Sequence, residues 1–368
     1  MVYYKTIRCY MYGTNVFGQW SWCETTNSSK DMSESTQDTE TFIGLKLLQI
    51  NWSYNLIKLG DNFFVSGAWC GKTDQFLKVP LPDGYKETET NNIDDLLITG
   101  NDFKLVLISK SRNTIWLIDL KIENEMKKID NNIEEPVDNV EKRKKKDISI
   151  SKVVLVSDCC MYLTSAGHVY SGIVHPSYVD TEHCHGRICD VKCGYEHYML
   201  LTDTGLVYTW GNGRRLQLGH GDISNLEVPT EVEALGGIKI KKIACGGWHS
   251  IALSETGDVY VWGWNDSGQL GIKCDGGQLE SQILPILIDL FDSNGEQVTI
   301  NIKDIACGSK HSALLLEDNS IWTTGYNKYG QLGCSEEKYP NISYFKKAFH
   351  CENDGTLMCG PWTTILIN

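Results

Sequence analysis

The stretch ACGGWHSIALSETGDVYVWGWNDSGQLG, residues 244–271, aligns without a gap to ACGSKHSALLLEDNSIWTTGYNKYGQLG, residues 306–333. A third copy, KCGYEHYMLLTDTGLVYTWGNGRRLQLG, keeps the same register at residues 192–219. Regular self-similarity of this kind indicates stacked units, none of which can bury its apolar face alone. We therefore expect a protein built from repeats.

Each copy contains two short runs of alternating apolar residues joined by a few turn residues, as in SIALS and DVYVW of the first stretch. Alternation with period two on both sides of a turn predicts a β-hairpin. More divergent copies fit the same register at 50–67, 100–118 and 156–172. One column of the turn holds only residue types that tolerate positive φ: Asp61, Asn113, Gly167, Gly205, Gly257 and Asn319.

The two ends of the chain together supply a seventh copy. The residues CGPWTTILIN at 359–368 match the first half of a copy, and YMYGTNVFGQW at 10–20 matches the second half. Radial repetition removes long exposed sheet edges, and seven units lie within the usual range of propeller blades. The sequence therefore predicts an all-β fold, a seven-bladed β-propeller closed by a blade shared between the N- and C-termini.

Residues 1–368 are expected to form one propeller domain with two polar segments outside the repeat. Both segments are nearly free of aromatic residues and cannot bury enough apolar surface to order themselves. We predict a polar loop over 24–40 and a charged, disordered insertion over 121–149. The insertion contains the basic run EKRKKKD at 141–147, which is either a contact for import receptors or acidic partners or a plain solvated loop.

Composition argues against several classes of protein. The formal net charge of -13 opposes attraction of the whole surface to nucleic acid or anionic membranes. The chain shows neither an apolar run of about eighteen residues that could span a bilayer nor the apolar run of a signal peptide at its start. Its 14 cysteines are expected to be reduced. We expect a monomer with no membrane contact and no direct nucleic-acid binding.

The run CGGWHSIALSETGDVYVWGWNDSGQLG resembles the repeat of the regulator of chromosome condensation family. Members of that family are seven-bladed propellers, often closed by a blade shared between the termini. The resemblance covers nearly the whole chain and is strongest in the three ungapped copies and the split copy. The copies between about residues 45 and 172 lack the Cys-Gly-x-x-His element of the others.

The resemblance also implies a function. It implies a non-enzymatic, protein-binding adaptor that is linked to chromatin and is nuclear and cytoplasmic. The implied partner is a JmjC-type 2-oxoglutarate oxygenase, with effects on histone methylation and mitotic chromosome segregation, and histones are a further implied contact. The family's founding member implies the alternative, guanine-nucleotide exchange on a small nuclear GTPase. We expect the adaptor, because the sequence shows neither the basic N-terminal tail nor the wedge-like insertion of those exchange factors.

No catalytic or cofactor-binding residues are expected, and no residues are assigned to a metal. His197, His249 and His311 each follow Cys-Gly at the same spacing, which places them on separate blades rather than in one tetrahedral site. We expect these rings to be buried and hydrogen-bonded to backbone. The cluster HCHGRICDVKC, from His183 to Cys193, leaves zinc binding open, although its spacing matches no standard zinc finger.

One column of the repeat holds glutamine in four copies, at Gln19, Gln217, Gln269 and Gln331. An amide side chain can both donate and accept hydrogen bonds. We predict that this side chain ties one blade to the next.

The register also predicts a binding surface on one rim of the ring. Trp248, Lys310 and Trp362 fall in one column of consecutive blades, and nearby turns add further aromatic and cationic side chains. Tryptophan and arginine are enriched at binding hot spots. The alternative is that the tryptophans pack between blades as part of the core. The predicted protein-binding residues are Arg214, Arg215, Trp248, Trp264, Lys310, Lys328 and Trp362.

Overall fold

The computed structural model of the 368-residue chain describes residues 9–20, 44–85, 93–111, 114–122, 125–129, 149–272, 280–335 and 337–367. These ranges contain strands β1 to β27 and two short 3-10 helices, η1 (Ile93–Asp95) and η2 (Glu233–Leu235), and no α-helix. None of the helices in these ranges is long and apolar enough to cross a membrane. The polar loop predicted over 24–40 lies outside them.

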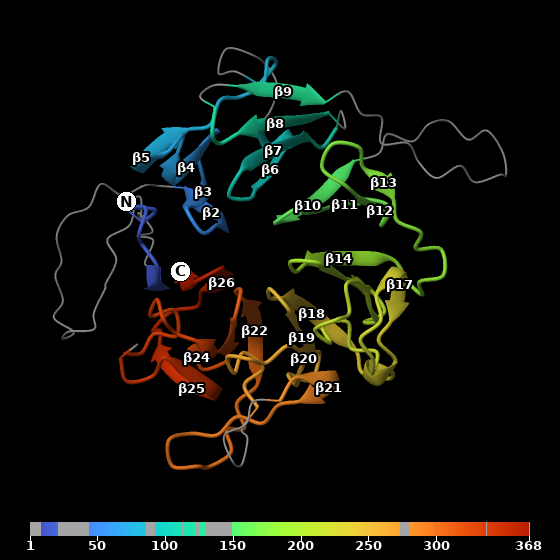
Figure 1. The fold of residues 1–368 in the computed structure, drawn as a ribbon, viewed down its shortest axis with the longest axis vertical. Coiled ribbons are helices and arrows are strands. Elements are labelled where there is room, and N and C mark those ends of the chain that lie inside the picture. Colours follow the sequence, from blue (N-terminus) through green and yellow to red (C-terminus); the bar gives the residue numbers. More distant parts are fainter. Residues whose placement is uncertain are drawn as a thin grey trace, which may run out of the picture.

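The strands form seven antiparallel sheets arranged in a ring, which confirms the predicted seven-bladed β-propeller (Figure 1). We name the sheets blades A to G. Blade A comprises β2 (Leu45–Ile50), β3 (Tyr54–Leu59), β4 (Asn62–Trp69) and β5 (Lys72–Lys78); blade B comprises β6 (Leu96–Gly100), β7 (Lys104–Ser109), β8 (Ile115–Asp119) and β9 (Met126–Ile129); blade C comprises β10 (Ile150–Val156), β11 (Cys159–Thr164), β12 (Val169–Ser171) and β13 (Ser177–Tyr178).

The remaining blades carry the better-matched copies of the repeat. Blade D comprises β14 (Ile188–Cys193), β15 (His197–Thr202), β16 (Val207–Gly211) and β17 (Leu226–Glu231); blade E comprises β18 (Ile240–Cys245), β19 (His249–Ser254), β20 (Val259–Gly263) and β21 (Gln282–Leu287); blade F comprises β22 (Ile302–Cys307), β23 (His311–Leu316), β24 (Ser320–Tyr326) and β25 (Asn341–His350). In each four-stranded blade the first strand lies next to the central axis and the fourth lies on the outside (Figure 1).

Blade G closes the ring with strands from both ends of the chain. It comprises β26 (Thr356–Gly360), β27 (Thr363–Ile367) and β1 (Cys9–Gly13), so the described residues supply three of its strands. β1 pairs with β27 from Cys9↔Ile367 to Gly13↔Thr363. The predicted sharing of a blade between the two ends is therefore confirmed.

The charged insertion predicted over 121–149 starts too early. Residues 126–129 form β9, which pairs with β8 from Ile118↔Met126 to Ile115↔Ile129. Ile129 is buried and Met126 is half-buried, whereas Lys127 and Lys128 are exposed. An outer strand buries only part of one face, so two apolar residues among four are enough to pack it against the blade. Because the segment around it is charged, the sequence pattern did not indicate a strand here. Residues 130–148 lie outside the described part of the chain.

Positive φ marks the hairpin turns at most of the predicted positions. Gly167, Gly205 and Gly257 have φ of 92°, 88° and 95°, and Asn319 has φ of 60°. In blade A the left-handed residue is Gly60, with φ of 54°, rather than Asp61. Glycine adopts positive φ without the steric cost that other residues have, so in this turn Gly60 rather than Asp61 takes the left-handed conformation. Asn113 lies outside the described residues.

The hydrophobic core lies between neighbouring blades. In one cluster Leu253 and Val261 of blade E pack with Leu314 and Trp322 of blade F, and all four are buried. Equivalent clusters join the other blades around the ring. Each blade therefore buries its apolar faces against its two neighbours, as the repeat pattern predicts.

Candidate protein-binding face

Two kinds of loop meet at one end of each blade. In blade E, the turn after β18 carries Trp248 and the loop after β20 carries Trp264, and the Trp264 N–H donates to the Trp248 carbonyl at 2.9 Å. Gly263, between β20 and this loop, has φ of 102°, and a Cβ there would lie 2.7 Å from the Trp248 oxygen. Glycine is thus required where the chain crosses over the turn. This crossing brings the two predicted tryptophans together.

Arg215 of blade D joins the two tryptophans of blade E. Its guanidinium carbon lies 3.6 Å from the centre of the Trp264 ring and 4.9 Å from that of Trp248. Lys310 of blade F adds a second cation, with Nζ 4.7 Å from the centre of the Trp264 ring. Cations are attracted to the negative face of an aromatic ring. Three consecutive blades therefore contribute to one cluster.

Neither tryptophan belongs to the core, since both Trp248 and Trp264 are half-buried. Trp248 also packs edge-on against Tyr195, with ring centres 5.7 Å apart. Lys310 is held by Asp266, with Nζ 2.7 Å from Oδ2. These contacts fix the aromatic rings and leave part of each ring accessible.

A pocket of about 410 Å³ opens beside this cluster, lined by Arg214, Arg215, Leu216, Trp264 and Ser281. Arg214 is exposed, and its backbone N–H donates to Asn212 Oδ1 at 2.9 Å. We define the cationic aromatic face as Arg214, Arg215, Trp248, Trp264 and Lys310. Its mixture of aromatic surface and positive charge suits an acidic segment of a partner protein.

Trp362 belongs to a second aromatic group, which adjoins the cationic aromatic face through the bond from the Tyr326 N–H to the Lys310 carbonyl at 2.9 Å. Trp362 packs with Tyr326 and Tyr329, whose ring centres each lie 5.5 Å from its own. Trp52 of blade A completes this group, 5.4 Å from Tyr329 and 6.4 Å from Trp362. Lys328 is exposed in the loop after β24 and does not line the pocket. The predicted set is therefore divided between two places on the ring.

Trp52, Tyr195, Tyr326 and Tyr329 were not among the predicted residues. Tyr195 and Trp52 share the column that precedes the Trp248 column. Blades E, F and G have Gly247, Ser309 and Pro361 there, and blades B and C have Asp102 and Asp158. Tyr326 occupies the same column as Trp264 and could have been found from the register alone. The aligned repeats therefore contain aromatic residues that point to these positions, but the aromatic residues fall in neighbouring columns rather than in a single one.

The repeated histidines are buried, as expected. His249 Nε2 lies 2.9 Å from Ser312 Oγ of the next blade, and Ser312 donates to the Gln269 carbonyl at 2.7 Å. Since the hydroxyl donates to that carbonyl, it accepts from the histidine Nε2–H. His197 faces Ser250 of the next blade in the same way at 3.1 Å. The side-chain partners seen here are thus serine hydroxyls, which link each blade to its neighbour.

Burial keeps these rings neutral. It lowers the pKa of His197 and of His249 to about 3, and that of His311 to about 4. A ring that stays neutral and enclosed in this way serves packing rather than proton transfer.

The prediction that the repeated glutamine side chain ties one blade to the next is wrong for three of the four copies. The Oε1 atom accepts a backbone N–H two residues earlier in its own loop, as Gln269 does from Ser267 at 2.9 Å. Only Gln19, among the described bonds, donates from Nε2 to the next blade, to the Trp52 carbonyl at 3.3 Å. The side chain is buried beneath its own turn, so it mainly closes that turn. The tie between blades passes instead through the backbone carbonyls of Gln217 and Gln269.

Within the His183–Cys193 cluster, Cys184 Sγ lies 3.9 Å from His183 Nε2, and the other described hydrogen bonds of the cluster's histidine and cysteine side chains go to backbone carbonyls. His183 Nε2 lies 2.5 Å from the Pro229 carbonyl, and Cys189 Sγ donates to the Leu201 carbonyl at 3.4 Å. Cys193 is buried, and burial raises its pKa well above the usual value. In the described ranges, no group of three or more His, Cys, Asp or Glu side chains is placed to hold a metal ion.

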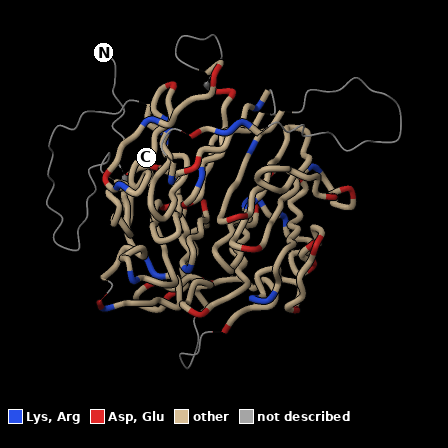
Figure 2. Tube along the Cα trace, turned by 45° about the horizontal axis from the view of Figure 1, so that its top comes forward, with Lys and Arg blue, Asp and Glu red and all other residues tan. Residues whose placement is uncertain are grey.

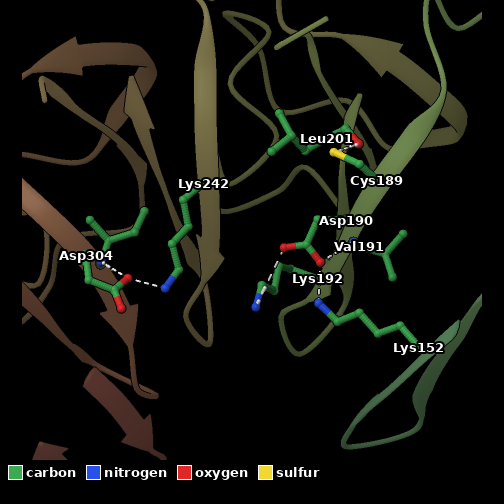
Figure 3. A network of polar contacts seen from close by, with 9 residues as sticks. Lys152, Cys189, Asp190, Val191, Lys192, Leu201, Lys242 and Asp304 are labelled. Carbon is green, nitrogen blue, oxygen red and sulfur yellow. Dashed lines mark hydrogen bonds and ion pairs between the residues drawn. The ribbon is translucent and has the colours of Figure 1, made fainter. Parts of the chain in front are cut away.

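Ion pairs lie on the inner strands of blades C to F, next to the central axis of the ring (Figure 3). Asp190 of β14 contacts Lys152 of β10, and its other oxygen lies 4.0 Å from Lys192 Nζ. Lys242 of β18 pairs with Asp304 of β22. Desolvation, together with the nearby Lys192 ammonium, lowers the pKa of Lys152. These pairs were not predicted, and they join inner strands of different blades.

Comparison with known proteins agrees with the repeats and the ring. The model of the regulator of chromosome condensation (RCC1) repeat matches residues 204–253 and 256–315, and a second model of the same repeat matches residues 188–217, 240–269 and 302–331. The matched residues fall in blades D to F, which carry the cationic aromatic face. The chain is thus a closed β-propeller that carries regulator of chromosome condensation (RCC1) repeats in blades D to F.

Among curated proteins, the chain is similar to RCC1 domain-containing protein 1 of Mus musculus, with 34% identity over 209 residues. This alignment covers 48% of the chain and 55% of the mouse protein, so the chain spans about half the length of the curated relatives it matches. Among solved structures, human WBSCR16 has a TM-score of 0.69 at 17% identity, covering 99% of both chains. Yeast RCC1 (Prp20), solved bound to Kap60, has a TM-score of 0.71 at 15% identity, covering 98% of this chain and 88% of that one. These two structures show the shared fold.

Proposed function

We propose that this protein is a non-enzymatic protein-binding adaptor that holds its partner on the cationic aromatic face. The observation that carries the proposal is the stacking of Arg215 between Trp248 and Trp264 beside an open pocket. Half-buried tryptophans with a stacked arginine form the kind of rigid, partly desolvated surface that dominates binding energy at protein interfaces.

We further propose that the partner is a JmjC-type 2-oxoglutarate oxygenase, bound in a chromatin-linked role in the nucleus and cytoplasm, with histones as a second contact. The family resemblance and the 34% identity to RCC1 domain-containing protein 1 support this choice. The positive charge of Arg214 and Arg215 favours an acidic segment of that partner at the pocket.

The test is affinity purification of the partner with the full chain, followed by binding measurements on the purified pair. The double variant Arg215→Glu/Trp264→Ala removes a cation and the ring beneath it, and should weaken binding at least about 30-fold. Lys328→Ala removes an exposed cation outside the pocket and should leave binding unchanged. Thermal melts of both variants should stay close to that of the wild type, since none of the affected side chains belongs to the hydrophobic core.

Recovery of the oxygenase by the wild type, and its loss in the double variant, would support the adaptor. Nucleotide exchange is the competing outcome. If the chain instead recovers a small GTPase and accelerates release of labelled GDP from it, the adaptor proposal is wrong.

A further inference from the structure

A second surface, on the outer side of blades D and E, exposes apolar side chains. Among the described residues, twelve large apolar side chains are exposed, and half of them lie in the two stretches 216–238 and 280–302. We define the outer D–E patch as five of these, with exposed fractions of 42% to 63%: Ile223, Val228, Ile283, Leu284 and Leu287. Apolar side chains gathered in this way mark interaction sites more often than scattered ones do.

Contacts between the two blades hold the patch together. The Gly221 N–H donates to the Ile283 carbonyl at 3.0 Å, and a Cβ at Gly221 would lie 3.6 Å from Leu284 Cδ2. At the other end of β21, η2 of blade D lies against the strand. β21 is the outermost strand of blade E (Figure 1). Three of its apolar side chains, Ile283, Leu284 and Leu287, are exposed.

The two stretches that carry the patch are acidic, and basic side chains approach it at one end, where Arg214 and Arg215 line a pocket with Ser281. The two stretches 216–238 and 280–302 contain eight carboxylates and no lysine or arginine: Asp222, Glu227, Glu231, Glu233, Glu280, Asp289, Asp292 and Glu296. None of these eight forms an ion pair with a described lysine or arginine. Elsewhere on the described ring, basic and acidic residues are interspersed (Figure 2). Apolar side chains within an acidic surround are complementary to a segment that carries leucine-like and basic residues together.

The edge of β21 is poorly suited to accept a further strand. Pro285 in its centre has no N–H to donate, and the Ile283 carbonyl already accepts from Gly221. A partner must therefore bind through side chains rather than by extending the sheet. A helix with one apolar face flanked by lysine or arginine provides those side chains.

We propose that the outer D–E patch is a second docking surface, which binds a basic amphipathic helix of a partner protein. It adjoins the cationic aromatic face at Ser281 and differs from it in the sign of its charge. It does not depend on the function proposed for that face, and the two can be tested separately.

The probe is a fluorescein-labelled synthetic peptide of about 18 leucine and lysine residues, with the leucines spaced to share one helical face. A shuffled peptide of the same composition, whose leucines do not share a face, is its control. Fluorescence anisotropy with the full chain measures both at about 0.1 M salt. We expect the amphipathic peptide to bind at least about tenfold more tightly than the shuffled one.

Two variants of the full chain test the patch itself. Leu284→Ser/Leu287→Ser removes exposed apolar surface, and Glu227→Lys/Glu280→Lys reverses two exposed carboxylates; each should weaken peptide binding at least about tenfold. Leu77→Ser, at a side chain 37% exposed on the outer strand of blade A, and Glu317→Lys/Glu352→Lys are the matched controls and should bind within about twofold of wild type. Arg215→Glu/Trp264→Ala should also bind normally, which separates this surface from the cationic aromatic face.

Equal affinity of the patch variants and their controls would overturn the proposal, as would equal binding of the two peptides by the wild type. The patch could instead bind a second copy of this chain. Sedimentation of the chain alone measures whether it dimerises. If the wild type dimerises and Leu284→Ser/Leu287→Ser does not, the patch is a self-association surface and the proposed helix site is wrong.

Discussion

His249 shows how a repeated side chain joins blades without taking part in a reaction. Its ring is fully buried, its Nε2 faces the Ser312 hydroxyl at 2.9 Å, and desolvation lowers its pKa to about 3. His197 and His311 occupy the equivalent places and their pKa values are lowered by the same cause. Native packing at three successive blades therefore requires neutral imidazoles.

We expect the propeller to lose stability as the pH falls below 6.5. An unfolded histidine binds a proton near pH 6.5, whereas the folded pKa values are about 3 to 4, so the unfolded state binds more protons in this window. Above pH 6.5 the buried rings do not lower the free energy of unfolding. Below pH 6.5 each buried ring should lower it by about 1.4 kcal/mol per pH unit. Urea denaturation at about pH 7.5, 6 and 5 measures this slope.

The variant His249→Asn serves as the control for this slope. It removes one titrating ring while keeping a side-chain donor near Ser312. The variant should be less stable at neutral pH, but its loss of stability on acidification should be smaller by about 1.4 kcal/mol per pH unit. If the free energy of unfolding fell with pH equally steeply in variant and wild type, the pKa of His249 would not be lowered in the folded protein.

At the scale of the strand and its loop, the crossing after β20 builds the cationic aromatic face. Gly263 lets the chain pass over the turn that carries Trp248, and the loop then places Trp264 against Arg215 of the preceding blade. Gly211 and Gly325 occupy the equivalent crossings of blades D and F, with φ of 104° and 111°. The repeat therefore constrains the backbone on which the variable side chains of the face are displayed.

Gly263→Ala should destabilise the protein by about 2 kcal/mol or more, because it combines positive φ with a Cβ that collides with backbone. The Cβ would lie 2.7 Å from the Trp248 oxygen. Gly295→Ala is the matched control, since Gly295 also has positive φ, at 81°, but has nothing within 4 Å of its Cβ. Thermal melts should show a clearly larger loss for Gly263→Ala; equal losses would mean that φ alone sets the cost.

The elements that the sequence predicts well are those governed by local pattern. Alternation and the Gly, Asn and Asp column placed the hairpins, and the split copy predicted the pairing of β1 with β27. β9 was missed because an outer strand with one buried residue, Ile129, has almost no apolar pattern. The pairing of Lys242 with Asp304 was missed because it depends on how β18 and β22, the inner strands of the neighbouring blades E and F, lie beside each other.

The same division applies to the cationic aromatic face. The register correctly placed Trp248 and Trp264 at one end of the blade, because both positions are fixed within the repeat. It did not show that Trp362 packs with Trp52, Tyr326 and Tyr329, because these contacts join blade G to its neighbours A and F. Contacts between blades leave no trace in the local pattern.

At the scale of the molecule, the ring depends on blade G. Met11 of β1 is buried against Leu47 and Ile57 of blade A and Ile365 of β27. Trp20, which follows β1, is also buried in this cluster, and its Nε1–H donates to the Thr14 carbonyl at 3.1 Å. The N-terminal strand thus contributes to the interface between blades G and A as well as to its own sheet.

Deletion of residues 1–20 should therefore abolish the cooperative unfolding transition. By analogy with core truncations, loss of buried Met11 costs about 2–5 kcal/mol and loss of buried Trp20 about 3–5 kcal/mol. Together these approach the whole stability of a typical domain. Calorimetry of the truncated chain measures this, and a synthetic peptide of residues 9–20 added in trans should restore part of the transition. A truncated chain that melts like the wild type would show that blade G does not need β1.

Pairing of β1 with β27 also sets an order of events during synthesis. β1 is synthesised before the other described strands, whereas its pairing partner β27 ends at residue 367. The chain grows at about 5–20 residues per second. During that time β1 has no strand to pair with. Until then the nascent chain is an open arc with one free end on blade A and another on blade F. Two such arcs synthesised close together can exchange their first strands, and this head-to-tail swapping is the characteristic error to which a ring sealed by its own ends is exposed.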